Sequence, residues 1–243
     1  LLAAAIAAWV VMGYSIPWLA VLSNPRRPIL EAANGTWFIW VVASQSIAVV
    51  AAGIEPLYPE ARQWLAIIAV TTWSMGVMLY AMCGLLLLFR LIMYRLEPQQ
   101  LDPPYWITMG AMAITVVAGA RIVEMDDAPM IDVTRALIAG LSVIFWAFAT
   151  WLIPALLAAG VWRHVVKRVP FRYQPTLWSF VFPMGMYAAA SIYLGRANRL
   201  PVVEAVGEIW FWAALLAWSI TAVGMVFDIG GRLSAWRNTK ETV

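Results

Sequence analysis

The segment LWSFVFPMGMYAAAS, residues 177–191, combines aromatic residues, a proline and a run of small residues in one apolar stretch. Phe180 and Phe182 come just before Pro183, and residues 188–191 are three alanines and a serine. Small residues let the backbones of membrane helices approach closely, and proline removes one hydrogen bond from the helical ladder. The segment is therefore typical of a closely packed membrane helix with a bend.

The composition of the whole chain agrees with a membrane environment. Hydrophobic residues make up 63% of the chain, charged residues only 12%, and the mean hydropathy is +0.80. Soluble domains are about 45–50% apolar and about 25% charged. These values predict an all-α integral membrane protein, for which we expect no nucleic-acid partner. The net charge of +3 is modest.

Seven apolar runs are long enough to cross the membrane, for which about 20 helical residues are needed. Proline-rich or charged segments such as NPRRP, EPLYPEARQ and RLEPQQLDPP separate them. We expect one transmembrane domain over residues 1–243 that is incomplete at its N-terminus. The predicted spans are 1–22, 36–53, 63–90, 105–123, 131–162, 176–195 and 201–231.

The distribution of basic residues predicts the orientation, because Lys and Arg favour the cytoplasmic side. Eleven basic residues follow the first, third, fifth and seventh spans, whereas five lie on the other side with eight of the thirteen acids. We therefore expect a multi-pass protein of the inner (plasma) membrane with a cytoplasmic C-terminus. The basic loop 163–172 is interpreted as a topology determinant, with an acidic membrane lipid as the alternative partner. The eleven basic residues on the predicted cytoplasmic side are Arg26, Arg27, Arg90, Arg95, Arg163, Lys167, Arg168, Arg172, Arg232, Arg237 and Lys240.

A two-helix unit repeats along the chain. Trp37, Trp106 and Trp178 each stand at the start of a short span rich in small residues, and they are separated by 69 and 72 residues. Long, bulkier spans alternate with the short ones. This alternation predicts an inner class of short helices around a central pore and an outer class of long, lipid-facing helices. The alternative is that the small residues only mark helix contacts.

The spans lack ionisable residues in their centres, which disfavours proton relays and retinal attachment. The single histidine, His164, lies at a predicted helix end, and the single cysteine, Cys83, has no partner for a disulfide or a metal site. We find no nucleophile and base pair and no phosphate-binding loop. We therefore predict no enzyme activity, no metal and no cofactor.

Polar groups on the short spans are candidates for the lining of an anion path, because hydroxyls and helix ends can replace a hydration shell. The alternative for each hydroxyl is a bond to the preceding helical turn. The helix N-termini are predicted to face the cytoplasm, where their dipoles favour an anion. The pore-lining candidates are Ser44, Thr108, Thr115 and Tyr187, and the candidate bend positions are Gly110, Pro183 and Gly185.

Three segments carry a resemblance to a known family: GTWFIWVVASQSIAVVAA (35–52), PPYWITMGAMAITVVAGA (103–120) and LWSFVFPMGMYAAAS (177–191). They resemble inner helices of the tellurite-resistance/C4-dicarboxylate transporter family, which includes the plant slow anion channels. The resemblance implies a ten-helix, five-fold pseudo-symmetric barrel of helical hairpins, assembled as a homotrimer with one pore per subunit. The seven spans then correspond to helices four to ten, with three helices missing upstream.

The resemblance also implies a gate. The family's occluding phenylalanine precedes the bend of the ninth helix, and Phe182 matches that position. Phe180, two residues earlier, is expected to face a neighbouring helix. The implied function is channel-like transport of a small anion, which is a C4-dicarboxylate, a tellurite-like or sulfite-like oxyanion, or a halide.

Two alternatives stay open at this point. A non-transporting scaffold or accessory subunit of a larger complex would use the same helices only for packing. A proton-coupled carrier would need an ionisable group in the missing helices, because the seven spans supply none.

Overall fold

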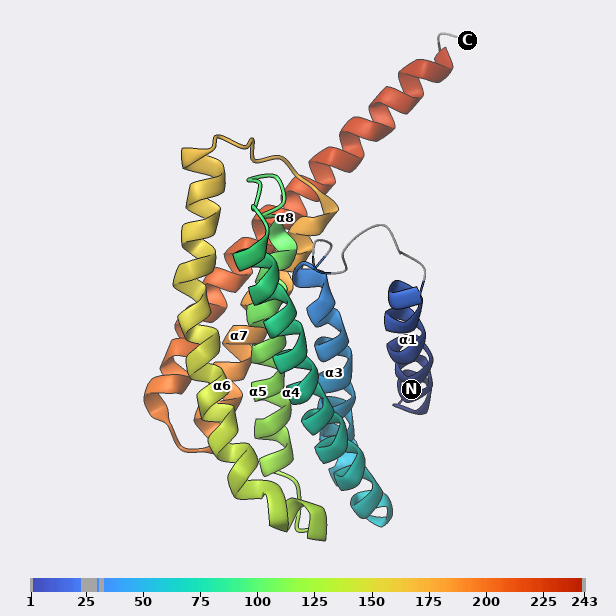
Figure 1. Ribbon diagram of the computed structural model, residues 1–243, viewed down its shortest axis with the longest axis vertical. Coiled ribbons are helices and arrows are strands. Elements are labelled where there is room, and N and C mark those ends of the chain that lie inside the picture. The colour runs from blue at the N-terminus through green and yellow to red at the C-terminus, as the bar shows by residue number, and fades with distance from the viewer. Residues whose placement is uncertain (1, 23–29, 31–32, 242–243) are drawn as a thin grey trace.

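The computed structural model describes residues 2–22, 30 and 33–241, and all regular elements there are helical. Seven helices are long and apolar enough to cross a membrane (Figure 1), which confirms the predicted all-α membrane fold. The last helix continues to Glu241, beyond the predicted end at 231. The helices are α1 (Leu2–Leu22), α3 (Ile39–Ile54), α4 (Arg62–Met93), α5 (Ile107–Val123), α6 (Pro129–Val161), α7 (Trp178–Ala197) and α8 (Pro201–Glu241).

Each of the short helices α3, α5 and α7 begins with a 3₁₀ turn. The turns are η1 (Gly35–Phe38), η4 (Pro103–Trp106) and η6 (Pro175–Leu177). The repeated tryptophan lies within two residues of the point where each turn becomes an α-helix. Neighbouring turns contact one another, and Pro104 O lies so close to Gly35 that a Cβ atom there would collide with it. We call this end of the bundle the 3₁₀ end.

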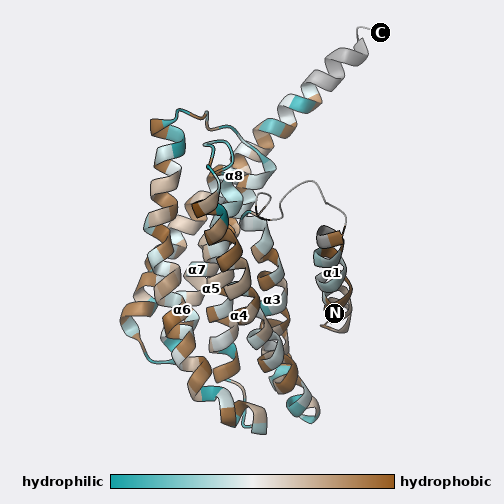
Figure 2. Cartoon of the chain, in the orientation of Figure 1, coloured by the Kyte–Doolittle hydropathy of each residue, from teal (hydrophilic) through white to brown (hydrophobic). Residues whose placement is uncertain are grey.

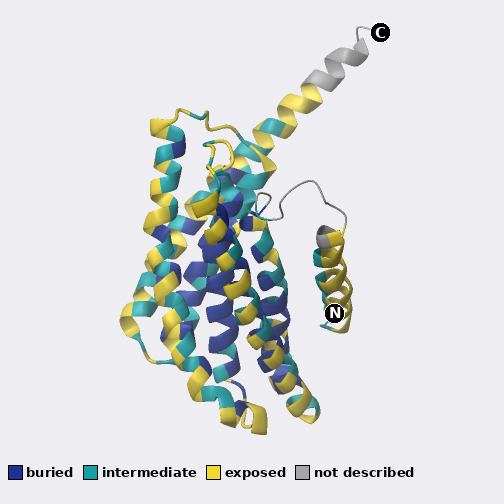
Figure 3. Ribbon diagram, in the orientation of Figure 1, coloured by how far each residue is buried: buried dark blue, intermediate teal, exposed yellow. Residues whose placement is uncertain are grey.

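Burial separates the short helices from the long ones. In the most apolar stretch of each helix, 89% of the residues of α5 are buried, against 44% in α3 and 39% in α7. The corresponding shares are only 28%, 22% and 17% in α4, α6 and α8. Helix α5 packs against α3, α4, α6 and α7 and forms the centre of the bundle (Figure 3). The long helices are rich in apolar residues (Figure 2), and many of these are exposed, as lipid contact requires.

Helix α1 lies beside α3 and exposes most of its surface (Figures 1 and 3). The Trp9 indole N–H donates a hydrogen bond of 2.9 Å to the Ser44 hydroxyl and so joins the two helices. The exposed residues of α1 include Val11, Tyr14 and Trp18, which suit a lipid surface. The basic residues Arg26 and Arg27, which the sequence places in the loop after α1, lie outside the described residues.

Two buried arginines hold the loop that leads into α5 at the 3₁₀ end. Arg90 of α4 donates to the Gln100 side chain and to Tyr94 O, and Arg163, just after α6, donates to Leu101 O. Burial raises the pKa of Asp102 in the same loop, and the charge of Arg163 opposes this shift. These contacts fix the approach of the chain to η4.

Ion pairs hold the loops at the opposite end. Arg62 bridges Glu55 and Asp126, each at 2.7 Å, so that it connects the α3–α4 and α5–α6 loops. Glu55 is buried, and a buried carboxylate needs such a partner. Arg196 and Glu204 likewise pair at 2.7 Å between α7 and α8.

Candidate functional site

One side of α7 carries only exposed and half-buried residues along most of its length. Phe182, Gly185, Ala189, Tyr193 and Arg196 follow one another at intervals of three or four residues, which places them on one face of the helix. Phe182 is 37% exposed, and a Cβ atom added to Gly185 would meet no other atom within 4 Å. We call these five residues the α7 stripe.

A groove of about 450 Å³ runs between this stripe and α8. Gly185 and Ala189 form part of its lining on α7, whereas the bulky Phe211 and Trp218 line it on α8. Arg196 is the only charged residue in the lining. The α7 stripe therefore passes from an exposed aromatic residue, over small residues, to a polar end.

The opposite side of α7 is locked against α5. Pro183 is buried in the interior of α7, and its ring faces Gly110 of α5. A Cβ atom on Gly110 would lie only 2.8 Å from Pro183 Cγ, so a larger residue does not fit without a shift of the helices. The predicted bend residues Gly110 and Pro183 are thus partners in one helix contact. This contact fixes the height and rotation at which α7 presents Phe182.

The two phenylalanines before Pro183 have different surroundings. Phe180 packs edge to face on Trp106, with the ring centroids 4.6 Å apart, whereas Phe182 lies on the open face. Two residues correspond to a rotation of about 200° around a helix, which explains the difference. Phe180 therefore has a packing role at the junction of η4 and α7.

Three of the predicted lining hydroxyls are buried and bonded within their own helices. Ser44, Thr108 and Thr115 donate to the carbonyls of Trp40, Tyr105 and Ala111 at 3.0, 2.8 and 2.7 Å. This is the bond to the preceding turn that the sequence left open as the alternative. Each hydroxyl is thus bonded to a protein atom. That these three residues line an anion path stays a prediction.

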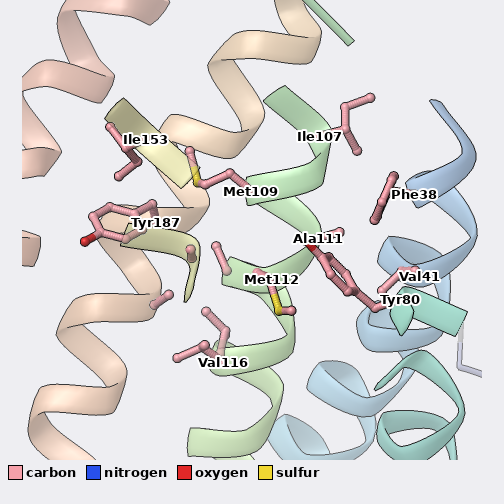
Figure 4. Packing of buried hydrophobic residues seen from close by; sticks show 14 of the residues in the cluster. Phe38, Val41, Tyr80, Ile107, Met109, Ala111, Met112, Val116, Ile153 and Tyr187 are labelled. Carbon is pink, nitrogen blue, oxygen red and sulfur yellow. The ribbon is translucent and has the colours of Figure 1, made fainter. Parts of the chain in front are cut away.

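Tyr187 points away from the α7 stripe. Its hydroxyl lies 2.7 Å from the Thr150 hydroxyl of α6, and its ring stacks on Trp146 and meets Trp210 of α8. Figure 4 places Tyr187 on one side of α5, with Phe38 and Tyr80 on the other. Five residues separate Tyr187 from Phe182, which corresponds to about 140° around the helix. The two side chains therefore do not line the same side of α7.

One polar pair near the opposite end of the bundle was not predicted from the sequence. Arg121, in the last turn of α5, donates a hydrogen bond of 2.9 Å to the hydroxyl of Tyr193 on α7. The guanidinium carbon lies 4.4 Å from the centre of the Tyr193 ring. The signal in the sequence was an arginine at the end of a short span, but nothing in the sequence pairs it with α7.

Gln45, like Ser44, is a fully buried polar residue of α3. Its amide Nε2 donates to Trp73 O at 3.1 Å, while its Oε1 has no partner among the described residues. Gly76 of α4 leaves the room for this amide, because a Cβ atom there would collide with it. Gln45 therefore joins α3 to α4 and does not face the α7 stripe.

Comparison with known proteins identifies the family. The family model of the voltage-dependent anion channels matches residues 1–226. The chain belongs to this family. The resemblance seen in the three short spans is thereby confirmed. Membership in a channel family supports anion transport, and not catalysis, as the class of function.

The relatives are membrane proteins of bacteria and archaea. An uncharacterized membrane protein of Mycobacterium tuberculosis is 56% identical over 155 residues, which are 64% of this chain and 79% of the relative. Two uncharacterized transporters of Methanocaldococcus jannaschii are 26% and 25% identical over 195 residues, or 80% of this chain. The matches cover 55% and 56% of the archaeal proteins. No solved structure matches the chain at a significant level.

Proposed function

We propose that this chain forms part of an anion channel or facilitator, with a path along the α7 stripe and Phe182 as its steric gate. The observation that carries the proposal is the position of Phe182. This large apolar side chain is 37% exposed on the open face of α7, while Pro183 behind it is locked against Gly110 of α5. The backbone at Phe182 is therefore held by the contact between α5 and α7, while its side chain is partly exposed.

The chemistry of the stripe suits a gate. An anion keeps its hydration shell unless polar groups replace it, and an apolar constriction opposes its passage by excluding water. Gly185 and Ala189 leave space beyond the constriction. Rotation of the Phe182 ring out of the path would widen it without any change in the α5–α7 contact.

The finer features of the proposal come from the family. The path would lie inside a five-fold ring of helices, to which this chain contributes α3, α5 and α7, and three such subunits would form a homotrimer. The 3₁₀ end and the C-terminus would face the cytoplasm, as the basic residues favour. The substrate would be a small anion: a C4-dicarboxylate, an oxyanion resembling tellurite or sulfite, or a halide.

The substitution Phe182→Ala tests the gate in the full-length protein reconstituted in liposomes. Halide flux should rise by roughly tenfold, which corresponds to about 1.4 kcal/mol of the barrier. Phe180→Ala is the matched control, because it removes the same ring from the packed side of α7 and should not open the path. An unchanged flux in a folded Phe182→Ala variant would contradict the gate assignment.

A non-transporting membrane subunit is the second candidate. The engagement of the Ser44, Thr108 and Thr115 hydroxyls by protein atoms favours it, because these groups then offer little to a passing anion. This candidate predicts no anion flux from the wild type or from Phe182→Ala. It also predicts that unrelated membrane chains co-purify with the full-length protein and cover the α7 stripe.

A further inference from the structure

The Arg121–Tyr193 pair is placed where a path along α7 would end. Tyr193 belongs to the α7 stripe, eleven residues after Phe182, which is about 16 Å along a helix and nearly the same face. Arg121 reaches this position from α5. Tyr193 also lines the groove beside α8, so the pair borders the open side of α7.

Arg121 differs from most of the basic residues near this end of the bundle in the partners it has. Arg62, Arg135 and Arg196 form ion pairs with carboxylates, at 2.7 to 2.9 Å for the closest pairs. In the part of the chain that the structure describes, no ion pair includes Arg121. Its contacts there are the neutral phenol group and ring of Tyr193. The positive charge of Arg121 is therefore not cancelled by an adjacent carboxylate.

The geometry also leaves donors for a ligand. A guanidinium group carries five N–H donors in a planar fork and stays charged at all physiological pH values. Only the Nη2 group of Arg121 donates to a protein acceptor in the described structure, and the Tyr193 ring holds the plane in place. A partly buried guanidinium of this kind is suited to bind a small anion with its remaining donors.

We propose that Arg121, oriented by Tyr193, binds a small anion at the end of the α7 stripe that lies opposite the 3₁₀ end. This site rests on the proposed function, since it supplies the binding step on one side of the Phe182 gate. The ligand is a monovalent halide, a small oxyanion or a single carboxylate. The phenol contributes by fixing the guanidinium, so Tyr193 is a positioning residue.

Chloride flux into liposomes tests the role of the site in transport. The substitution Arg121→Gln should raise the half-saturating chloride concentration by about fivefold, because a local positive charge concentrates the anion. Arg199→Gln is the matched control, since Arg199 is exposed near the same end of the bundle and forms no ion pair among the described residues. Equal shifts in both variants would overturn the proposal and indicate a diffuse surface charge.

A binding measurement separates this site from the proposed function. Chloride replaces a bulky organic anion at constant ionic strength, and the melting temperature of the full-length protein is followed in detergent. Chloride should stabilise the wild type and Arg199→Gln, because a ligand that binds only the folded state raises its stability. Arg121→Gln should lose this effect. If Arg121→Gln does not fold, Arg121→Lys takes its place in this measurement. Lysine keeps the positive charge but lacks the planar set of guanidinium donors.

The flux and melting measurements together distinguish failure of the Arg121 site from failure of the transport function. Stabilisation of the wild type by chloride without any flux would refute the transport function and retain the Arg121 site. Flux in the wild type with the same chloride response in Arg121→Gln and Arg199→Gln would refute the site and retain the transport function. Tyr193→Phe should weaken the chloride response less than Arg121→Gln, because the ring contact remains.

Discussion

Helices α5 and α7 have similar lengths and the same tryptophan register, yet they have different surroundings. Helix α5 is buried on all sides, and its hydroxyls bond to their own backbone. Helix α7 is buried on the side of Pro183 and Tyr187 and open on the side of Phe182 and Gly185. The repeated unit thus produces both a packing centre and an open face. A residue near the centre of the bundle is therefore not necessarily a residue that would line an anion path.

The largest effect is expected from a substitution that disrupts the contact between these two helices. Gly110→Leu places a side chain where Pro183 already lies, so it should destabilise the fold by about 3 kcal/mol through overpacking. Gly185→Leu, on the open face, should leave the melting temperature in detergent within a few degrees of the wild type. Comparable losses in both variants would contradict the distinction between a locked and an open side of α7.

Tyr187→Phe sharpens the comparison at the buried side of α7. It removes the hydrogen bond to Thr150 and should cost about 1 kcal/mol of unfolding free energy, a usual value for one such bond. Chemical denaturation in detergent gives this free energy. Thr150→Val should cost no more when Tyr187→Phe is already present, whereas full additivity of the two losses would show that the hydroxyls do not interact.

Thr115→Val gives the smallest expected effect. The Thr115 hydroxyl donates to Ala111 O within α5, and that carbonyl keeps its helical partner when the hydroxyl is replaced by a methyl group. The stability should change by less than about 0.5 kcal/mol, because an isosteric replacement in an apolar site is nearly neutral. Anion flux in liposomes should also stay unchanged, and a clear loss of flux would return Thr115 to the lining of the path.

The sequence predicted the elements of this fold better than their contacts. The tryptophan register and the alternation of short and long spans follow from local composition, which one chain displays directly. The pairing of Gly110 with Pro183, and of Arg121 with Tyr193, joins residues 72 or more positions apart. A helix periodicity does not specify which neighbour each face meets, so neither pair was predictable.

The candidate site shows the same limit. Phe182 was identified through the family resemblance, whereas its separation from Tyr187 follows from helix geometry alone. The sequence favoured hydroxyls as lining groups because they are the polar atoms of the short spans. In the structure, these hydroxyls are bonded within helices or, for Tyr187, to α6. The polar group that we propose as an anion ligand is instead the guanidinium of Arg121, near the end of α5.

The contacting 3₁₀ turns have a consequence for motion within the bundle. Where Pro104 O meets Gly35, the backbones of η1 and η4 touch directly, and no flexible side chain lies between them. We therefore expect relative displacement of the short helices to be smallest at the 3₁₀ end and to increase with distance from it. The Arg121–Tyr193 pair lies at the far end, where we expect this displacement to be largest. Occupancy of that pair by an anion would then be coupled to the separation of α5 and α7.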